Sequence, residues 1–63
     1  MTNQEKLQRL QDCVALLEDV DAMQQVALGD SDVCYDNHNR IQDLIADFEE
    51  DIQNIRLAEE ADA

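Results

Sequence analysis

Proline is absent from the sequence, and Gly29 is the single glycine. With 44% of residues hydrophobic, this composition excludes a low-complexity linker. Aromatic residues are limited to Tyr35 and Phe48, so the apolar side chains are mostly Leu, Ile, Val and Ala. A core built from such side chains is typical of packed helices.

Basic residues are also few. Four Lys and Arg stand against sixteen Asp and Glu, and the formal net charge is −12. Contacts with phosphate groups require Lys and Arg, so direct binding to nucleic acid or to an anionic membrane is not expected. The charge favours a basic protein partner, and it also fits a need for solubility or a high-salt environment.

A cysteine framework and long apolar runs are missing as well. Cys13 and Cys34 are too few for a disulfide scaffold. In a chain that folds back near Gly29 they would lie about 15 Å apart along the helices, so we expect reduced thiols. No apolar run reaches the roughly 18 residues of a membrane span, and the first residues do not resemble a signal peptide. We therefore expect a cytoplasmic protein.

Residues 3–28 are predicted to form one helix, because apolar residues recur along them every three or four positions. One row comprises Leu7, Leu10, Val14 and Leu17. An adjacent row comprises Cys13, Leu16, Val20, Met23 and Ala27. The combined face is wider than a coiled-coil seam, so this helix is expected to pack against more than one neighbour.

A bend over residues 29–36 is predicted to separate this helix from a second one over residues 37–59, which is followed by a frayed tail at 60–63. Gly29 suits the helix end because glycine readily adopts a left-handed conformation. The Asp, Asn and Ser residues that follow Gly29 can bind the backbone and so compete with helical hydrogen bonds. The second helix is therefore expected to start either at Ser31 or only near Asn37. Its apolar row comprises Cys34, His38, Ile41, Ile45, Phe48, Ile52 and Ile55.

The predicted fold is all-α: a two-helix antiparallel hairpin that forms a single domain. A chain of 63 residues buries a small core and usually needs further support. Since most soluble oligomers are symmetric dimers, we expect two hairpins to form a homodimeric four-helix bundle. The scaffold and dimer core is assigned to Leu10, Val14, Leu17, Val20, Ile41, Ile45, Phe48 and Ile52.

No catalytic constellation can be named, because the sequence lacks a nucleophile–base set, a phosphate-binding loop and a paired-acid pocket. Potential metal ligands do gather in residues 30–38. The pairs typical of zinc sites are absent, and Cys34 with His38 is the one ligand-like spacing. Acids that cap a helix, with Cys34 and His38 on its apolar row, explain this cluster. We predict no enzyme activity, no metal and no cofactor, and keep a metal or redox sensor as an alternative to be tested.

The acids on the outer face of the second helix support a sharper hypothesis. They are Asp36, Asp43, Asp47, Glu50 and Asp51. Side chains four residues apart on a helix lie about 6 Å apart, close to the spacing of phosphates along a nucleic-acid strand. Such a stripe suits a basic groove that normally holds DNA or RNA. The simpler interpretation is a solvated charged face, and Asp36 is also spaced to pair with Arg40.

Asp21 and Gln24 occupy the positions at which the Leu7 row would continue. The row therefore ends before the bend and leaves a polar patch, which is either a binding surface or the exposed end of a bundle.

His38 is predicted to lie at the edge of the core with one ring nitrogen hydrogen-bonded. The alternative role for this histidine is a pH switch.

The opening Met1-Thr2-x-Gln4-Glu5-Lys6, the chain length and a bend near Asp30 resemble the plasmid repressor-of-primer family. That family consists of dimeric helical hairpins that bind paired RNA loops, and the matching motif covers six residues. The positions that present basic, amide and phenylalanine side chains to RNA in the family differ here: Asn3, Leu10, Val14, Glu18 and Gln25. The resemblance thus implies a dimeric hairpin, but RNA binding is not carried over.

Taken together, these patterns predict a small acidic binding or inhibitory protein that occludes a basic, nucleic-acid-binding surface of a protein target. Small acidic chains of this kind suit a phage or a mobile element. The alternative is a structural or assembly subunit that packs through its apolar helix faces, in which the acids serve solubility alone.

Overall fold

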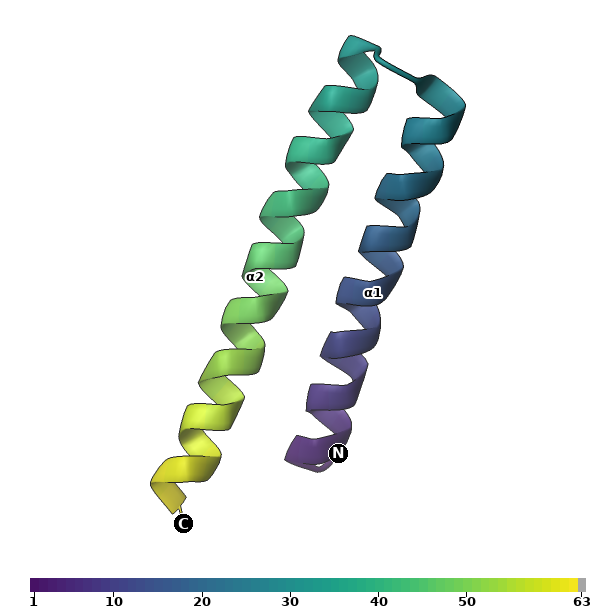
Figure 1. Cartoon of the computed structure of the whole chain (residues 1–63). Coiled ribbons are helices and arrows are strands. Elements are labelled where there is room, and N and C mark those ends of the chain that lie inside the picture. Colours follow the sequence, from purple (N-terminus) through teal and green to yellow (C-terminus); the bar gives the residue numbers. More distant parts are fainter. Residues whose placement is uncertain (63) are drawn as a thin grey trace.

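Two antiparallel helices form the molecule (Figure 1), and the predicted all-α hairpin is confirmed. The computed structural model describes residues 1–62, and their side chains as far as Ala61. Helix α1 spans Asn3–Leu28 and helix α2 spans Asp32–Asp62. The hairpin measures 48 × 15 × 13 Å. Within the described range, neither helix has an apolar segment long enough to span a membrane.

Helix α1 has the predicted bounds, and specific residues account for both of its ends. At the start, the Thr2 hydroxyl accepts a hydrogen bond of 3.1 Å from the backbone N–H of Glu5, which satisfies one of the free donors of the first turn. At the end, Gly29 adopts a φ of +62° and its N–H donates to the Gln25 carbonyl at 2.9 Å. That backbone conformation favours glycine.

Helix α2 starts at Asp32, five residues before the predicted start at residue 37, so the bend covers only residues 29–31. The cause is Ser31. Its hydroxyl accepts from the Cys34 N–H at 3.1 Å, and its carbonyl accepts from the Tyr35 N–H at 3.2 Å. Once this cap is in place, the polar residues that follow lie in the first helical turns. The helix also continues through Asp62, beyond the predicted end at residue 59, while Ala63 lies outside the described residues.

The core is a single seam between the two helices. Its buried apolar residues are Leu7, Cys34, Ile41, Ile45 and Ile52. The half-buried ones include Leu10, Val14, Leu17 and Phe48. Val20, assigned to the core from the sequence, keeps 46% of its surface exposed in the hairpin. A seam this narrow leaves the second apolar row of α1 uncovered.

Candidate protein-binding surfaces

The acid stripe consists of Asp36, Asp43, Asp47, Glu50 and Asp51, all five exposed on α2. Asp36, Asp43 and Glu50 are spaced by seven residues and so lie along one line of the helix. That line lies on the side of α2 away from the buried residues Ile41, Ile45 and Ile52. Asp43, Asp47 and Asp51 follow one another at intervals of four residues, about 6 Å apart.

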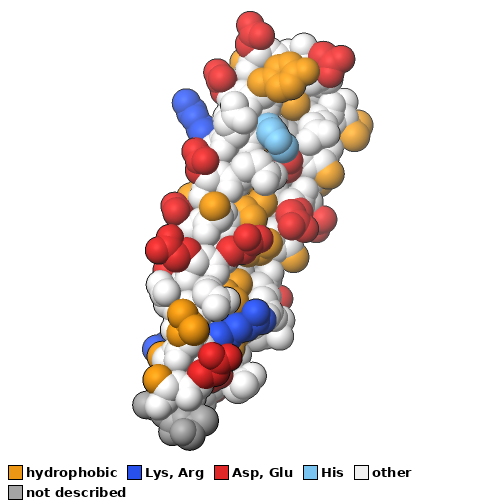
Figure 2. Space-filling model, turned by 60° about the vertical axis from the view of Figure 1, so that its left-hand side comes forward, with side chains coloured by type: hydrophobic (Ala, Val, Ile, Leu, Met, Phe, Trp, Pro, Cys, Tyr) orange, Lys and Arg blue, Asp and Glu red, His pale blue; other side chains and the backbone are white. Residues whose placement is uncertain are grey.

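These carboxylates are not neutralised within the hairpin. The described side chains contain one ion pair, between Asp21 and His38, and the expected pair between Asp36 and Arg40 is not formed. Figure 2 shows acidic side chains along both edges of one face, with Lys and Arg side chains at few places between them. The stripe is therefore an exposed run of carboxylates that form no ion pair with a Lys or Arg of residues 1–61, and Arg40 is the cation that lies among them, four residues after Asp36 and three before Asp43.

Asp21 and His38 form a polar layer inside the seam near the bend. His38 Nδ1 lies 2.7 Å from Asp21 Oδ2, and Gln24 Nε2 donates to Asp21 Oδ1 at 2.9 Å. A carboxylate oxygen accepts hydrogen bonds, so the His38 Nδ1–H is the donor. Asp21 is only 7% exposed, and both of its oxygens are satisfied. The polar residues that interrupt the two apolar rows thus bind one another.

The environment of Asp21 favours its ionised form. The hydrogen bond from Gln24 lowers the pKa of the Asp21 carboxyl below its ordinary value of 3.8, and the hydrogen bond and charge of His38 act in the same direction. Burial opposes this shift but does not cancel it. Asp21 thus remains a carboxylate at neutral pH, held by groups from both helices.

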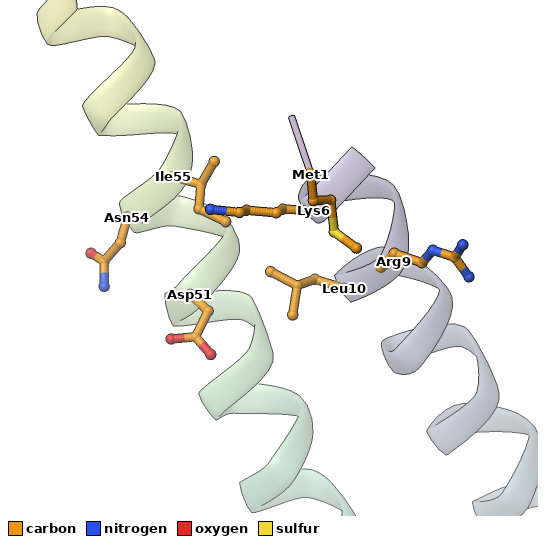
Figure 3. A pocket seen from close by; sticks show the side chains of 7 residues that line it. All are labelled: Met1, Lys6, Arg9, Leu10, Asp51, Asn54 and Ile55. Atoms are coloured by element: carbon orange, nitrogen blue, oxygen red, sulfur yellow. The ribbon is translucent and has the colours of Figure 1, made fainter. Parts of the chain in front are cut away.

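One flank of the hairpin contains an open pocket of about 450 Å³ (Figure 3). Lys6 and Leu10 point from α1 toward α2, whereas Arg9 points away from it. The full lining is Met1, Lys6, Arg9, Leu10, Asp51, Asn54 and Ile55. This pocket lies at the end of the flank where the first residues of α1 are found.

The same flank becomes apolar toward the middle of the hairpin. Positions seven residues apart lie on the same side of a helix in this kind of packing. Counting from Lys6, α1 continues this flank with Cys13 and Val20, and counting from Arg9, which points away from α2, gives Leu16 and Met23 on the adjoining outer side of α1. Counting back from Asp51, α2 continues it with Leu44. We call these five residues the apolar flank: Cys13, Leu16, Val20, Met23 and Leu44.

Four of the five residues of the apolar flank are substantially exposed. The exposed fractions are 64% for Leu16, 46% for Val20, 63% for Met23 and 46% for Leu44. The breadth of the combined apolar face predicted that the first helix packs against more than one neighbour, and in the hairpin α2 covers mainly the row of Leu7, Leu10, Val14 and Leu17. Large apolar side chains at helical spacing without a neighbour are typical of an interaction surface.

The opposite flank contains His38, the one histidine, which is visible in Figure 2 close to hydrophobic side chains. Two pockets, of about 330 and 470 Å³, lie on it. One is lined by Gln11, Val14, Glu49, Ile52, Gln53 and Arg56. The other is lined by Gln25, Gly29, Asp30, Cys34, Tyr35 and His38.

Neither cysteine belongs to a metal or disulfide site in the part of the chain that is described. Cys13 and Cys34 are both free thiols, and Cys34 is buried in the seam. Among residues 1–61, no three side chains of His, Cys, Asp or Glu are grouped so that they could hold a metal ion. Cys34 packs in the core, while His38 is held by Asp21.

Comparison with known proteins returned no match to a family model, to a curated protein or to a solved structure.

Proposed function

We propose that this protein binds and blocks a basic surface of another protein, through the acid stripe of α2. The observation that carries the proposal is that all five carboxylates are exposed and have no Lys or Arg partner among residues 1–61. Blocking requires no chemical step from the hairpin. Its helices supply a rigid support that fixes the positions of the charges.

The target is proposed to be a nucleic-acid-binding protein of the cytoplasm. Basic grooves that hold DNA or RNA neutralise a row of phosphates with Lys and Arg. Asp43, Asp47 and Asp51 offer such a groove a row of negative charges about 6 Å apart on one helix. In this role the protein is an inhibitor that mimics DNA. Complementary charge of this kind also accelerates association, in a manner that salt suppresses.

A triple substitution in the acid stripe tests the proposal: Asp43→Asn, Asp47→Asn and Glu50→Gln. The matched control changes three other exposed acids, Glu18→Gln, Glu49→Gln and Glu60→Gln, so both variants lose the same net charge. Each protein is immobilised, exposed to a bacterial lysate and eluted in rising salt. We expect nucleic-acid-binding proteins to leave the wild type and the control at moderate salt and to be lost from the stripe variant. Equal capture by all three would contradict the proposal.

The second candidate function is assembly through the apolar flank, and its support is the exposure of Leu16, Val20 and Met23. Two copies placed flank to flank would form the homodimeric four-helix bundle expected from the sequence. In this account the acids serve solubility. The two candidates respond differently to salt, since exposed charge contacts are screened at high ionic strength and apolar packing is not.

A further inference from the structure

The larger of the two pockets beside His38 lies where α1 ends and α2 begins. Its volume of about 470 Å³ falls in the range of about 300–1,000 Å³ that is usual for ligand sites. We call it the bend pocket, and its lining is Gln25, Gly29, Asp30, Cys34, Tyr35 and His38. None of these lining residues is a Lys or an Arg, so the pocket has no cation of its own.

The end of α1 makes one wall of the bend pocket electronegative. Gln25 and Gly29 both line the pocket, so the last helical turn borders it. The last four carbonyls of a helix have no partner within the helix, and Gly29 N–H satisfies one of them, that of Gln25. The aligned peptide dipoles add partial negative charge at this end, which favours a nearby cation. The last turn of α1 contains no basic residue that could serve as that cation.

Two side chains add acceptors to this wall. Asp30 is exposed and forms no ion pair among residues 1–61. His38 donates its Nδ1–H to Asp21 at 2.7 Å, so the ring nitrogen that remains is Nε2, which is an acceptor in a neutral imidazole. The bend pocket thus offers a carboxylate and an imidazole nitrogen to a ligand that donates hydrogen bonds.

Tyr35 adds an aromatic face to the same pocket, and it is 59% exposed. The face of an aromatic ring attracts cations, and a guanidinium group is flat enough to stack on it. A guanidinium also has five N–H donors and no acceptor, so it can serve several acceptors at once. Arg40 is the nearest cation along α2, but it lies two residues after His38 and leaves the helix on roughly the opposite side.

We propose that the bend pocket binds a guanidinium group, which the basic partner supplies as an Arg side chain. This inference rests on the proposed function and names one group of the partner that the hairpin recognises. Asp36, the first residue of the acid stripe, directly follows Tyr35 in the chain. An Arg side chain held in the pocket would therefore lie at one end of the stripe and fix how the partner is placed along it.

Three small compounds provide the probe: the Nα-acetylated amides of arginine, lysine and citrulline. Citrulline has the shape of arginine without the charge. The chain contains one His and one Tyr, so the ring signals of His38 and Tyr35 can be followed by NMR while each compound is added at constant ionic strength. The titration is run at about pH 8, at which imidazole is ordinarily uncharged. We expect the arginine amide to shift both rings saturably, the lysine amide to bind at least about threefold more weakly, and the citrulline amide to give no saturable shift.

Two single substitutions form a matched pair. Asp30→Asn removes the carboxylate that lines the pocket and is expected to weaken the arginine amide about fivefold. Asp32→Asn removes the same charge from an exposed acid outside the lining and is expected to change the affinity by less than about twofold. A third variant, Tyr35→Leu, keeps an apolar side chain without the aromatic face, and it is expected to weaken the arginine amide as well. Circular dichroism checks that the helices persist.

The outcomes separate this inference from the proposed function. The stripe variant Asp43→Asn, Asp47→Asn, Glu50→Gln retains every residue of the bend pocket, so it is expected to bind the arginine amide as the wild type does. An arginine amide that causes no saturable shift, or that the lysine or citrulline amide matches, would overturn the inference. So would equal weakening by Asp30→Asn and Asp32→Asn. None of these results would touch the proposed function, which fails only if the stripe variant captures basic proteins as well as the wild type.

Discussion

The Asp21 carboxylate lies 2.7 Å from the imidazole Nδ1 of His38, across the seam between the two helices. Asp21 interrupts the apolar row of α1, and His38 interrupts that of α2. A buried carboxylate without a partner would be costly, whereas one that accepts two hydrogen bonds is stabilised. Shifting one helix along the other would separate the two residues. The pair thus favours the observed antiparallel register.

The first prediction concerns the pH dependence of Asp21. Because its pKa is lowered in the folded state, its contribution to stability is present above the ordinary pKa of 3.8 and is lost as the pH falls through the folded-state value. Acid also relieves repulsion among the other carboxylates, so the informative quantity is the difference between the wild type and Asp21→Asn. We expect the wild type to be more stable at pH 6, and this advantage to shrink below pH 4. Urea unfolding provides the measurement, and an advantage that is independent of pH would contradict the assignment.

The second prediction compares the seam with the apolar flank. Ile45 is 6% exposed, so Ile45→Ala is expected to cost about 2–5 kcal/mol of unfolding free energy, a large share of the stability of a small domain. Leu16 is 64% exposed, so Leu16→Ala is expected to change the free energy by less than about 0.5 kcal/mol. Urea unfolding of both variants tests this. A cost at Leu16 comparable with that at Ile45 would mean that the flank is covered in solution.

The third prediction concerns the start of α2. Ser31→Ala removes the hydroxyl that accepts from the Cys34 N–H, and we expect a loss of about 1 kcal/mol. Ser31→Asp restores an acceptor and is expected to retain the stability. Hydrogen exchange at the amides of residues 34–36 should accelerate in the alanine variant alone. Unchanged exchange there would show that the cap does not determine the helix start.

The fourth prediction concerns Gly29, whose φ of +62° and ψ of −144° form a combination that is nearly restricted to glycine. A methyl group added at Gly29 meets no atom within 4 Å, so any cost comes from the backbone and not from a clash. Gly29→Ala is expected to destabilise the hairpin by about 1–3 kcal/mol. A thermal melt of this variant equal to that of the wild type would contradict the conformation of the bend.

Local signals predicted much of the fold. The bounds of α1 follow from a cap at Thr2, a regular apolar spacing and a single glycine, all of which act within a few residues. Of the two starts of α2 that the sequence left open, the one at Ser31 is within one residue of the observed Asp32, and the start at residue 37 was too late, because Asp, Asn and Ser favour caps and turns as readily as they compete with a helix. The sequence did not determine which of these residues caps the helix. In the structure the cap is Ser31.

The candidate surfaces were predictable in part. The exposure of Asp43 and Asp47 followed from their spacing relative to Ile41 and Ile45. The contact between Asp21 and His38 was not predicted, because it depends on how the two helices are aligned and not on either helix alone. The width of the apolar face of α1 was visible in the sequence, but only the structure shows that α2 leaves Leu16 and Met23 uncovered.

Competition with DNA tests the central claim most directly. A nucleic-acid-binding protein captured by the hairpin is mixed with a labelled DNA duplex, and the wild-type hairpin is titrated into the complex. We expect the DNA to be released as the hairpin binds, and the variant Asp43→Asn, Asp47→Asn, Glu50→Gln to release it far less well than the control Glu18→Gln, Glu49→Gln, Glu60→Gln. A ternary complex in which DNA and hairpin are bound together would contradict the claim that the acid stripe occupies the nucleic-acid site.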